Sequence, residues 1–285
     1  MPGTLYIVAT PIGNLSDLSL RAGEVLAEVD AVVAEDTRRT QKLLAHLGLA
    51  RRPLLSLPAF DERGRLGEVV SRLASGEELA LCTDAGTPAI SDPGQKLVAA
   101  AWEAGARVVP VPGPCAALTA LMASGLSCDR FLFLGFLPRQ GTKRRESLAL
   151  LARLGTTAVL YEAGNRLAST LRDLVIALGD RQAVVARELT KLHEEIVRGP
   201  LGALATRFSE GARGEVTLVV EGGPRATDDE EDEESLEEEL LRRLTGGERP
   251  SDIAREVARH RGLKRSDVYL ALERLRKGGA GGLPR

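Results

Sequence analysis

The sequence has 285 residues, of which 44% are hydrophobic, and a chain of this size can bury the cores of two domains and carry a small appendage. Its three cysteines and three histidines are scattered without metal-ligand spacing, which predicts structural thiols and no metal site. The net charge of −2 does not by itself indicate a nucleic-acid partner, and neither an export leader nor a membrane-spanning apolar run occurs, so we expect a soluble, cytoplasmic protein.

Short apolar strands alternate with helical segments through residues 1–113, which we expect to form an N-terminal α/β domain. Strands are predicted over residues 5–9, 30–34, 53–57 and 79–83, and again from residue 108. Helices are predicted between them, and this alternation predicts a parallel sheet.

The stretch from Leu79 to Gly94 is the first candidate site. Its apolar strand ends in a loop of small residues, hydroxyls, two carboxylates, two glycines and two prolines. Open α/β sheets bind ligands at such strand ends. The glycines permit unusual backbone conformations and the prolines fix φ, so the loop should hold Asp84, Thr87 and Ser91 in place before a ligand arrives. Taken alone, the loop is equally well explained as a turn without a ligand.

Two other strand ends carry candidate residues. Asp36 is suited to cap the next helix, and Arg38 and Arg39 form either a phosphate-facing patch or an ordinary solvated helix face. Cys115 and Ala116 begin a helix with small side chains, which either exposes its free N–H groups to a ligand or packs closely on the sheet. The spacing of a dinucleotide-binding or P-loop motif is absent, so those sites are disfavoured.

A second α/β domain is expected over residues 114–224. Strands are predicted over residues 131–138, 157–162 and 215–221, and from residue 183 into a segment of alternating charge. Helices are expected to reach residue 154 and to cover residues 167–178. The basic run with Lys143, Arg144 and Arg145 is predicted to lie in a loop and to contact RNA. Arg39 is also predicted to contact RNA.

Five motifs occur together in the order and spacing of one family. They are TPIGN at 10–14, AEDTR at 34–38, DAGTP with SDPG at 84–94, PGPCAA at 112–117 and RELTK at 187–191. With these motifs the chain resembles the ribosomal RNA small subunit methyltransferase I family, within the tetrapyrrole-methylase-like superfamily. The resemblance runs from about residue 5 to residue 222 and continues more weakly through the tail.

The resemblance implies two consecutive α/β domains with a cofactor cleft between them, and a homodimer. It implies S-adenosylmethionine as cofactor and, as substrate, the ribose 2′-hydroxyl of a cytidine in the decoding region of 16S rRNA, reached within the small ribosomal subunit. On the motif positions we expect the cofactor to contact Pro11, Asp84, Ala85, Gly86, Thr87, Ser91, Cys115, Ala116 and Phe136.

Two departures from the family pattern bear on the catalytic base. Where relatives usually show a His-x-His-Asn pattern after the third strand, this chain has Pro58, Ala59, Phe60 and Asp61. Where they often show a histidine before Arg166, it has an asparagine at 165. A mechanism that uses those histidines as the base is therefore in doubt.

Four residues are candidates to act on the reacting hydroxyl. Glu188 is placed to accept its proton, and Lys191 or Arg38 to hold a phosphate or stabilise the developing oxyanion, with Asp36 facing them from the first domain. The alternative is a network of interdomain salt bridges. Because a ribose hydroxyl is a much weaker acid than a carboxylic side chain, we expect alignment to supply most of the rate.

The tail separates its charges. Residues 225–239 are strongly acidic and are expected to form a linker. Residues 240–285 are expected to form a basic helical module that resembles a helix-turn-helix, with an excess of six positive charges from residue 249 onward. Lys264 and Arg265 are predicted to meet RNA phosphates, although three-helix modules also mediate protein contacts.

Two other functions remain open. One is a methyltransferase of the same fold acting on a tetrapyrrole or another small acceptor, against which the basic tail argues. The other is a non-enzymatic nucleic-acid-binding regulator, against which the paired cofactor-like loops argue.

Overall fold

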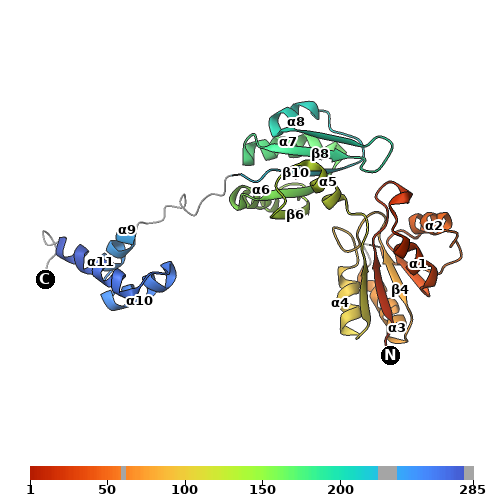
Figure 1. Ribbon diagram of the computed structural model, residues 1–285, viewed down its shortest axis with the longest axis horizontal. Coiled ribbons are helices and arrows are strands. Elements are labelled where there is room, and N and C mark those ends of the chain that lie inside the picture. Colours follow the sequence, from red (N-terminus) through yellow and green to blue (C-terminus); the bar gives the residue numbers. More distant parts are fainter. Residues whose placement is uncertain (59–61, 224–235, 279–285) are drawn as a thin grey trace. The chain divides into compact units, whose positions relative to one another are not determined.

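The computed structural model describes residues 1–58, 62–223 and 236–278. The chain divides into two compact units, Met1–Arg225 and Ala226–Arg285. The first unit contains two five-stranded sheets, and the described part of the second contains three helices (Figure 1). Among the described helices, none combines the length and apolarity needed to cross a bilayer.

The first sheet is entirely parallel, which confirms the prediction for this half of the chain. Its strand order is β3-β2-β4-β1-β5. The strands are β1 (Thr4–Val8), β2 (Ala31–Ala34), β3 (Leu54–Ser56), β4 (Leu79–Cys82) and β5 (Arg107–Val111). All of their carboxyl ends therefore meet at one edge of the sheet.

Helices cover both faces of this sheet (Figure 1). They are α1 (Leu20–Glu28), α2 (Thr37–His46), α3 (Glu62–Ala74) and α4 (Gln95–Glu103). Alternate strand residues point to opposite faces, so Val32 and Ala80 pack with α1 and α2, whereas Val33 and Leu81 pack with α3 and α4. Both faces are buried, which explains why these strands are continuously apolar.

The second sheet is mixed, with the order β6-β7-β10-β8-β9. Its strands are β6 (Phe131–Phe136), β7 (Thr157–Ala163), β8 (Gln182–Arg187), β9 (Glu195–Pro200) and β10 (Glu215–Val220). Only β6 and β7 run parallel, and β10, the last of these strands in the chain, occupies the centre of the sheet. Its amino end thereby lies beside the carboxyl ends of β7 and β8.

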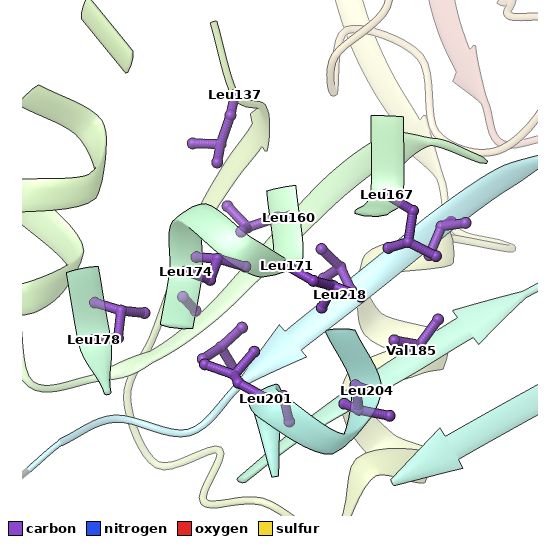
Figure 2. Packing of buried hydrophobic residues seen from close by; sticks show 14 of the residues in the cluster. Leu137, Leu160, Leu167, Leu171, Leu174, Leu178, Val185, Leu201, Leu204 and Leu218 are labelled. Carbon is purple, nitrogen blue, oxygen red and sulfur yellow. The ribbon is translucent and has the colours of Figure 1, made fainter. Parts of the chain in front are cut away.

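The helices of the second half pack mainly on one face of its sheet. They are α5 (Ala116–Ser124), α6 (Thr142–Leu154), α7 (Leu167–Leu178) and α8 (Leu201–Arg207). Leucines of α7 and α8 meet strand residues such as Leu160 and Leu218 in one core (Figure 2). Helix α5 packs on the opposite face, against residues that include Val159 and Val219.

Strand β9 and helix α8 were not predicted from the sequence. The charged residues that follow Arg187 obscure the strand pattern, and the chain turns back there as a hairpin in which β9 pairs antiparallel with β8. An ion pair between Arg187 and Glu195 closes the hairpin. Strand β9 lies at the sheet edge and is only partly buried, so its sequence lacks the apolar run of the buried strands.

The second unit contains α9 (Leu236–Thr245), α10 (Pro250–Arg261) and α11 (Arg265–Gly278). Its small core includes Ile253, Val257, Val268 and Leu272, all buried. Helix α9 begins at Leu236, four residues before the predicted start of the module, because Leu236 and Leu240 pack into that core. The rest of the predicted acidic linker, residues 225–235, lies outside the described residues.

The buried face of α7 generates a stability prediction. Replacing Leu171, which is fully buried (Figure 2), by alanine removes packed methyl groups and leaves a cavity. We expect the free energy of unfolding to fall by about 2–5 kcal/mol. Ile176→Ala on the same helix is the matched control, since that side chain is 84% exposed and its loss should change stability by less than about 0.5 kcal/mol. Urea denaturation followed by circular dichroism measures both, and equal losses would contradict the packing described.

Candidate functional site

A cleft with an empty volume of about 800 Å³ lies among the loops at the strand ends of both sheets. From the first half it is lined by Ile12 after β1, by residues 85–87 and 90–92 after β4, and by Cys115 and Ala116 after β5. From the second half it is lined by Phe136, Tyr161, Ala186, Glu188, Leu189, Lys191, Glu215, Val216 and Thr217.

The loop after β1 is joined to the loop after β4. The backbone N–H of Thr10 donates to the Gly86 carbonyl at 2.8 Å, and the Gly86 N–H donates back at 3.0 Å. The Thr10 hydroxyl donates to the Thr83 carbonyl at 3.1 Å. Farther along the loop, the Thr87 hydroxyl donates to the Pro114 carbonyl at 3.1 Å, which joins the loop after β5 as well. Three strand ends of the first sheet are thus connected before any ligand binds.

Strained backbone is concentrated at the cleft. Among the described residues, the non-glycine residues with positive φ are Ala89 (67°), Ser91 (66°), Glu188 (51°) and Thr190 (64°). Each such residue costs about 1–3 kcal/mol and persists only where its surroundings hold it. All four lie in the two loops that face this cleft, at residues 84–94 and 188–194. Strain confined in this way points to a functional site.

Glycines allow the loops of the two halves to approach each other. A Cβ atom on Gly13 would lie 2.5 Å from Lys191 Cγ and 2.9 Å from Thr190 Oγ1. A Cβ on Gly135, which has a φ of 60° at a bulge in β6, would lie 2.6 Å from Ser91 Oγ. These two positions therefore require glycine.

The charged groups lining the cleft are predominantly acidic. Asp92, Glu188 and Glu215 face a single lysine, Lys191, whose Nζ lies 2.9 Å from Glu188 Oε1. Burial raises the pKa of Asp92 to about 6, and the neighbouring carboxylates, Glu215 among them, act in the same direction. Burial also raises the pKa of Tyr161, whose phenol accepts a hydrogen bond from the Ala117 N–H at 3.2 Å. The cleft is therefore suited to a ligand that carries positive charge.

Seven of the nine residues expected to contact the cofactor line the cleft. These are Ala85, Gly86, Thr87, Ser91, Cys115, Ala116 and Phe136. Pro11 does not line the cleft. Its two neighbours in the chain do reach it or its wall: Thr10 pairs with Gly86, and Ile12 lines the cleft. Asp84 does not line it either, because its carboxylate accepts a hydrogen bond from the Asp36 N–H at 3.1 Å.

The four candidate catalytic residues separate into two pairs. Glu188 and Lys191 line the cleft, whereas Asp36 and Arg38 do not. Asp36 caps α2, and Arg38 donates to its two carboxylate oxygens at 3.1 and 2.8 Å. This hydrogen bonding lowers the pKa of Asp36 to about 2. Arg39, a predicted RNA contact, lies 3.4 Å from Asp84.

The basic run lies in the first turn of α6, not in a loop as predicted. Lys143 and Arg145 are exposed, but Arg144 is buried and its guanidinium donates to Asp173, Thr170 and the Pro138 carbonyl. These donors of Arg144 are used inside the fold, which argues against a role for them in binding RNA. In the second unit, Lys264 lies between α10 and α11 and Arg265 is the first residue of α11, and both are exposed.

Several residues of the cleft were not assigned from the sequence. Asp92 belongs to the SDPG motif at residues 91–94 and could have been assigned to the cleft from its position in that loop. Tyr161 and Glu215 lie in strands, and only the antiparallel placement of β10 beside β7 and β8 brings Glu215 to the cleft. No local pattern in the sequence signals that topology.

No histidine lines the cleft among the described residues. Asn165 is exposed in the short helix Gly164–Arg166, outside the lining. Pro58 also lies outside it, and Ala59, Phe60 and Asp61 lie outside the described residues. Within the described ranges, no group of histidine, cysteine or acidic side chains is arranged to hold a metal ion.

Comparison with known proteins places this chain in a family. Residues 4–205 match the family Tetrapyrrole (Corrin/Porphyrin) Methylases. A protein of Xylella fastidiosa named Ribosomal RNA small subunit methyltransferase I is 47% identical over 94% of this chain and 98% of its own length. A protein of the same name from Synechocystis is 45% identical over 95% of this chain and 98% of its own length.

Solved structures support the fold independently. A cobalt precorrin-4 methyltransferase superposes with a TM-score of 0.59 at 19% identity, over 76% of this chain and 94% of that one. A uroporphyrin-III-C-methyltransferase from Thermus thermophilus gives 0.56 at 21% identity, over 77% and 94%. Both sheets are therefore those of a known fold, and the chain belongs to the tetrapyrrole methylase family and, within it, to the ribosomal RNA small subunit methyltransferase I group.

Proposed function

We propose that this protein transfers a methyl group from S-adenosylmethionine to the ribose 2′-hydroxyl of a cytidine in the decoding region of 16S rRNA. One observation carries the proposal: four of the five family motifs converge on a single acidic cleft, at Ile12, residues 85–92, Cys115 with Ala116, and Glu188 with Lys191. The names of the full-length relatives support an rRNA substrate. A substrate in the small ribosomal subunit implies a cytoplasmic site of action.

The residues lining the cleft fit S-adenosylmethionine, which combines a nucleoside, a positively charged sulfur and an amino acid. Gly86, Ala85 and Ala116 are small and leave backbone groups accessible to the nucleoside and the amino acid. Ile12 and Phe136 provide apolar surface. The carboxylates of Asp92 and Glu215 complement the positive charge at the sulfur and the amino group.

Methyl transfer needs a displacement in line with the departing sulfur, and the cofactor supplies the electrophilic methyl group when it is bound. The chain contributes alignment, because strained loops tied to one another hold their shape before binding. Correct alignment can contribute about 7–11 kcal/mol to lowering a barrier. This is the largest contribution that the rigid loops offer.

Glu188 and Lys191 act on the hydroxyl that is methylated. Glu188 accepts the proton as the new bond forms, so that full deprotonation of the weakly acidic ribose is never required. Lys191 Nζ, 2.9 Å from Glu188 Oε1, stabilises the oxygen while it carries negative charge. The left-handed backbone of Glu188 and the tight turn from Lys191 N–H to the Glu188 carbonyl, at 3.0 Å, fix this pair in position.

A homodimer is part of the same proposal, as in the family that the motifs resemble. Leu118 and Met122 of α5 are 53% and 80% exposed and lie one helical turn apart. A second copy of the chain would remove such apolar side chains from water.

Cofactor binding is tested by Gly86→Val. Gly86 has a φ of 88°, and an added Cβ would lie 3.3 Å from Ile12 Cγ2 at the cleft wall. We expect the Kd for S-adenosylmethionine, measured by calorimetry, to rise at least about tenfold, a loss of about 1.4 kcal/mol.

Gly48→Val is the matched control for backbone strain. Gly48 has a φ of 75° with open space around its Cβ position, and it lies outside the cleft lining. Both variants should remain folded by circular dichroism, and only Gly86→Val should bind more weakly. A wild-type chain that gives a flat titration would favour a non-enzymatic regulator.

The substrate is tested with unmethylated small ribosomal subunits and labelled cofactor. We expect one methyl group per subunit, mapped to the ribose of a cytidine in the decoding region. Glu188→Gln should lower kcat by about 10²–10⁴-fold with little change in cofactor affinity, because it removes the proton acceptor while keeping the shape. Asp36→Asn, outside the cleft lining, should lower kcat far less. Label only in an added tetrapyrrole or other small acceptor would select that alternative.

The raised pKa of Asp92 generates a pH prediction. Below a pKa of about 6 this carboxyl is neutral, and above it the negative charge attracts a cationic ligand. Affinity for S-adenosylmethionine should therefore increase as pH rises from 5 to 7, in the region around that value. S-adenosylhomocysteine, whose sulfur is uncharged, should show a smaller increase, and Asp92→Asn should reduce the difference between the two ligands. Equal pH profiles for both ligands in the wild type would refute this role of Asp92.

A further inference from the structure

A second cleft, with an empty volume of about 720 Å³, lies between the beginnings of α6 and α7. Four arginines line it, Arg139, Arg144, Arg145 and Arg166, and Asp173 is the one acidic residue in its described lining. The cleft is therefore strongly basic, in contrast to the acidic cleft described above.

Two of these arginines build the walls. Arg144 is buried and donates to Asp173 Oδ2 at 2.8 Å, to the Pro138 carbonyl at 3.0 Å and to Thr170 Oγ1 at 3.0 Å. Arg166 lies 3.3 Å from the buried Glu162 and donates to the Leu137 carbonyl at 3.1 Å. Both side chains therefore fix the segment that connects β6 to α6.

The other two arginines keep their charge available. Arg139 and Arg145 are exposed, and neither has an acidic partner among the residues that the structure describes. Arg145 Nη2 donates to the hydroxyl of Thr142 at 3.2 Å, which leaves its charge uncompensated. An arginine held in this way presents several N–H donors to a phosphate.

The basic cleft is close to the proposed catalytic cleft. Phe136 of β6 and Tyr161 of β7 line the catalytic cleft and are register partners in the sheet. Arg139 follows Phe136 by three residues, so their Cα atoms are separated by at most about 11 Å. The acidic lining of the catalytic cleft repels phosphates, and a strand whose ribose enters it must place its phosphates elsewhere.

We propose that Arg139 and Arg145 bind the backbone phosphates of the RNA strand next to the nucleotide that is methylated. This inference rests on the proposed function and adds a location for the flanking strand. Phosphate contacts of this kind fix the register of a strand without reading its bases. The basic cleft thereby selects which ribose reaches Glu188.

The test compares two double variants that remove equal charge. Arg139→Gln with Arg145→Gln removes the two available arginines of the basic cleft. Arg153→Gln with Arg107→Gln removes two exposed arginines outside its lining, at the far end of α6 and on β5. Methyl transfer to small ribosomal subunits gives kcat and KM, and co-sedimentation gives subunit binding directly.

We expect the double variant Arg139→Gln with Arg145→Gln to raise the KM for subunits at least about tenfold. The slope of the logarithm of the binding constant against the logarithm of salt concentration should become smaller in magnitude by about 1.4–1.8, the amount for two phosphate contacts. The Kd for S-adenosylmethionine should not change, and the second variant should bind subunits nearly as the wild type does. Normal KM and salt slope in the first variant would overturn the inference while leaving the methyltransferase proposal intact. If the wild-type chain binds subunits through these arginines but transfers no methyl group, only the methyltransferase proposal is contradicted. If the wild-type chain does not bind subunits, the methyltransferase proposal and the phosphate-binding inference are both overturned.

Discussion

The backbone N–H of Asn14 donates a hydrogen bond of 3.0 Å to Thr190 Oγ1, and this contact joins loops that are 176 residues apart in the chain. It connects the loop after β1, already paired to Gly86, with the strained turn that carries Glu188 and Lys191. The cleft depends on this connection, because its walls come from two separate sheets. Rigid loops on separate sheets form one site only when they are held against each other.

The distribution of charge divides the proposed work between two clefts, one formed by loops of both sheets and one on the second half alone. Carboxylates line the cleft proposed to bind the cationic cofactor, and arginines line the cleft between α6 and α7. If these carboxylates and arginines lined a single cleft, they would form ion pairs with one another, and their charges would cancel. Separation lets each surface keep the potential that its proposed ligand requires. A network of Glu162, Arg166, Thr170 and Arg144 spans the space between β7 and α6 and fixes the wall of the basic cleft.

The sequence was informative where burial and backbone geometry dominate. Apolar strands such as residues 79–82 and the glycine- and proline-rich loop after them could be predicted, because both faces of the first sheet are buried and the loop needs special φ values. It was less informative where position depends on topology. Glu215 reaches the cleft only because β10 is antiparallel, and β9 is a half-exposed edge strand with a polar sequence. The sequence around Arg144 predicts an exposed charge, but in the structure this side chain is buried and donates hydrogen bonds to Asp173 and Thr170.

The central position of β10 has a consequence for the biogenesis of the protein. All five strands of the first sheet lie before residue 112, so that sheet can assemble while the ribosome is still translating the rest. The second sheet has a gap between β7 and β8 until residues 215–220 have emerged. During this interval the nascent chain exposes two unpaired strand edges, at which incorrect pairing can occur until β10 inserts between them.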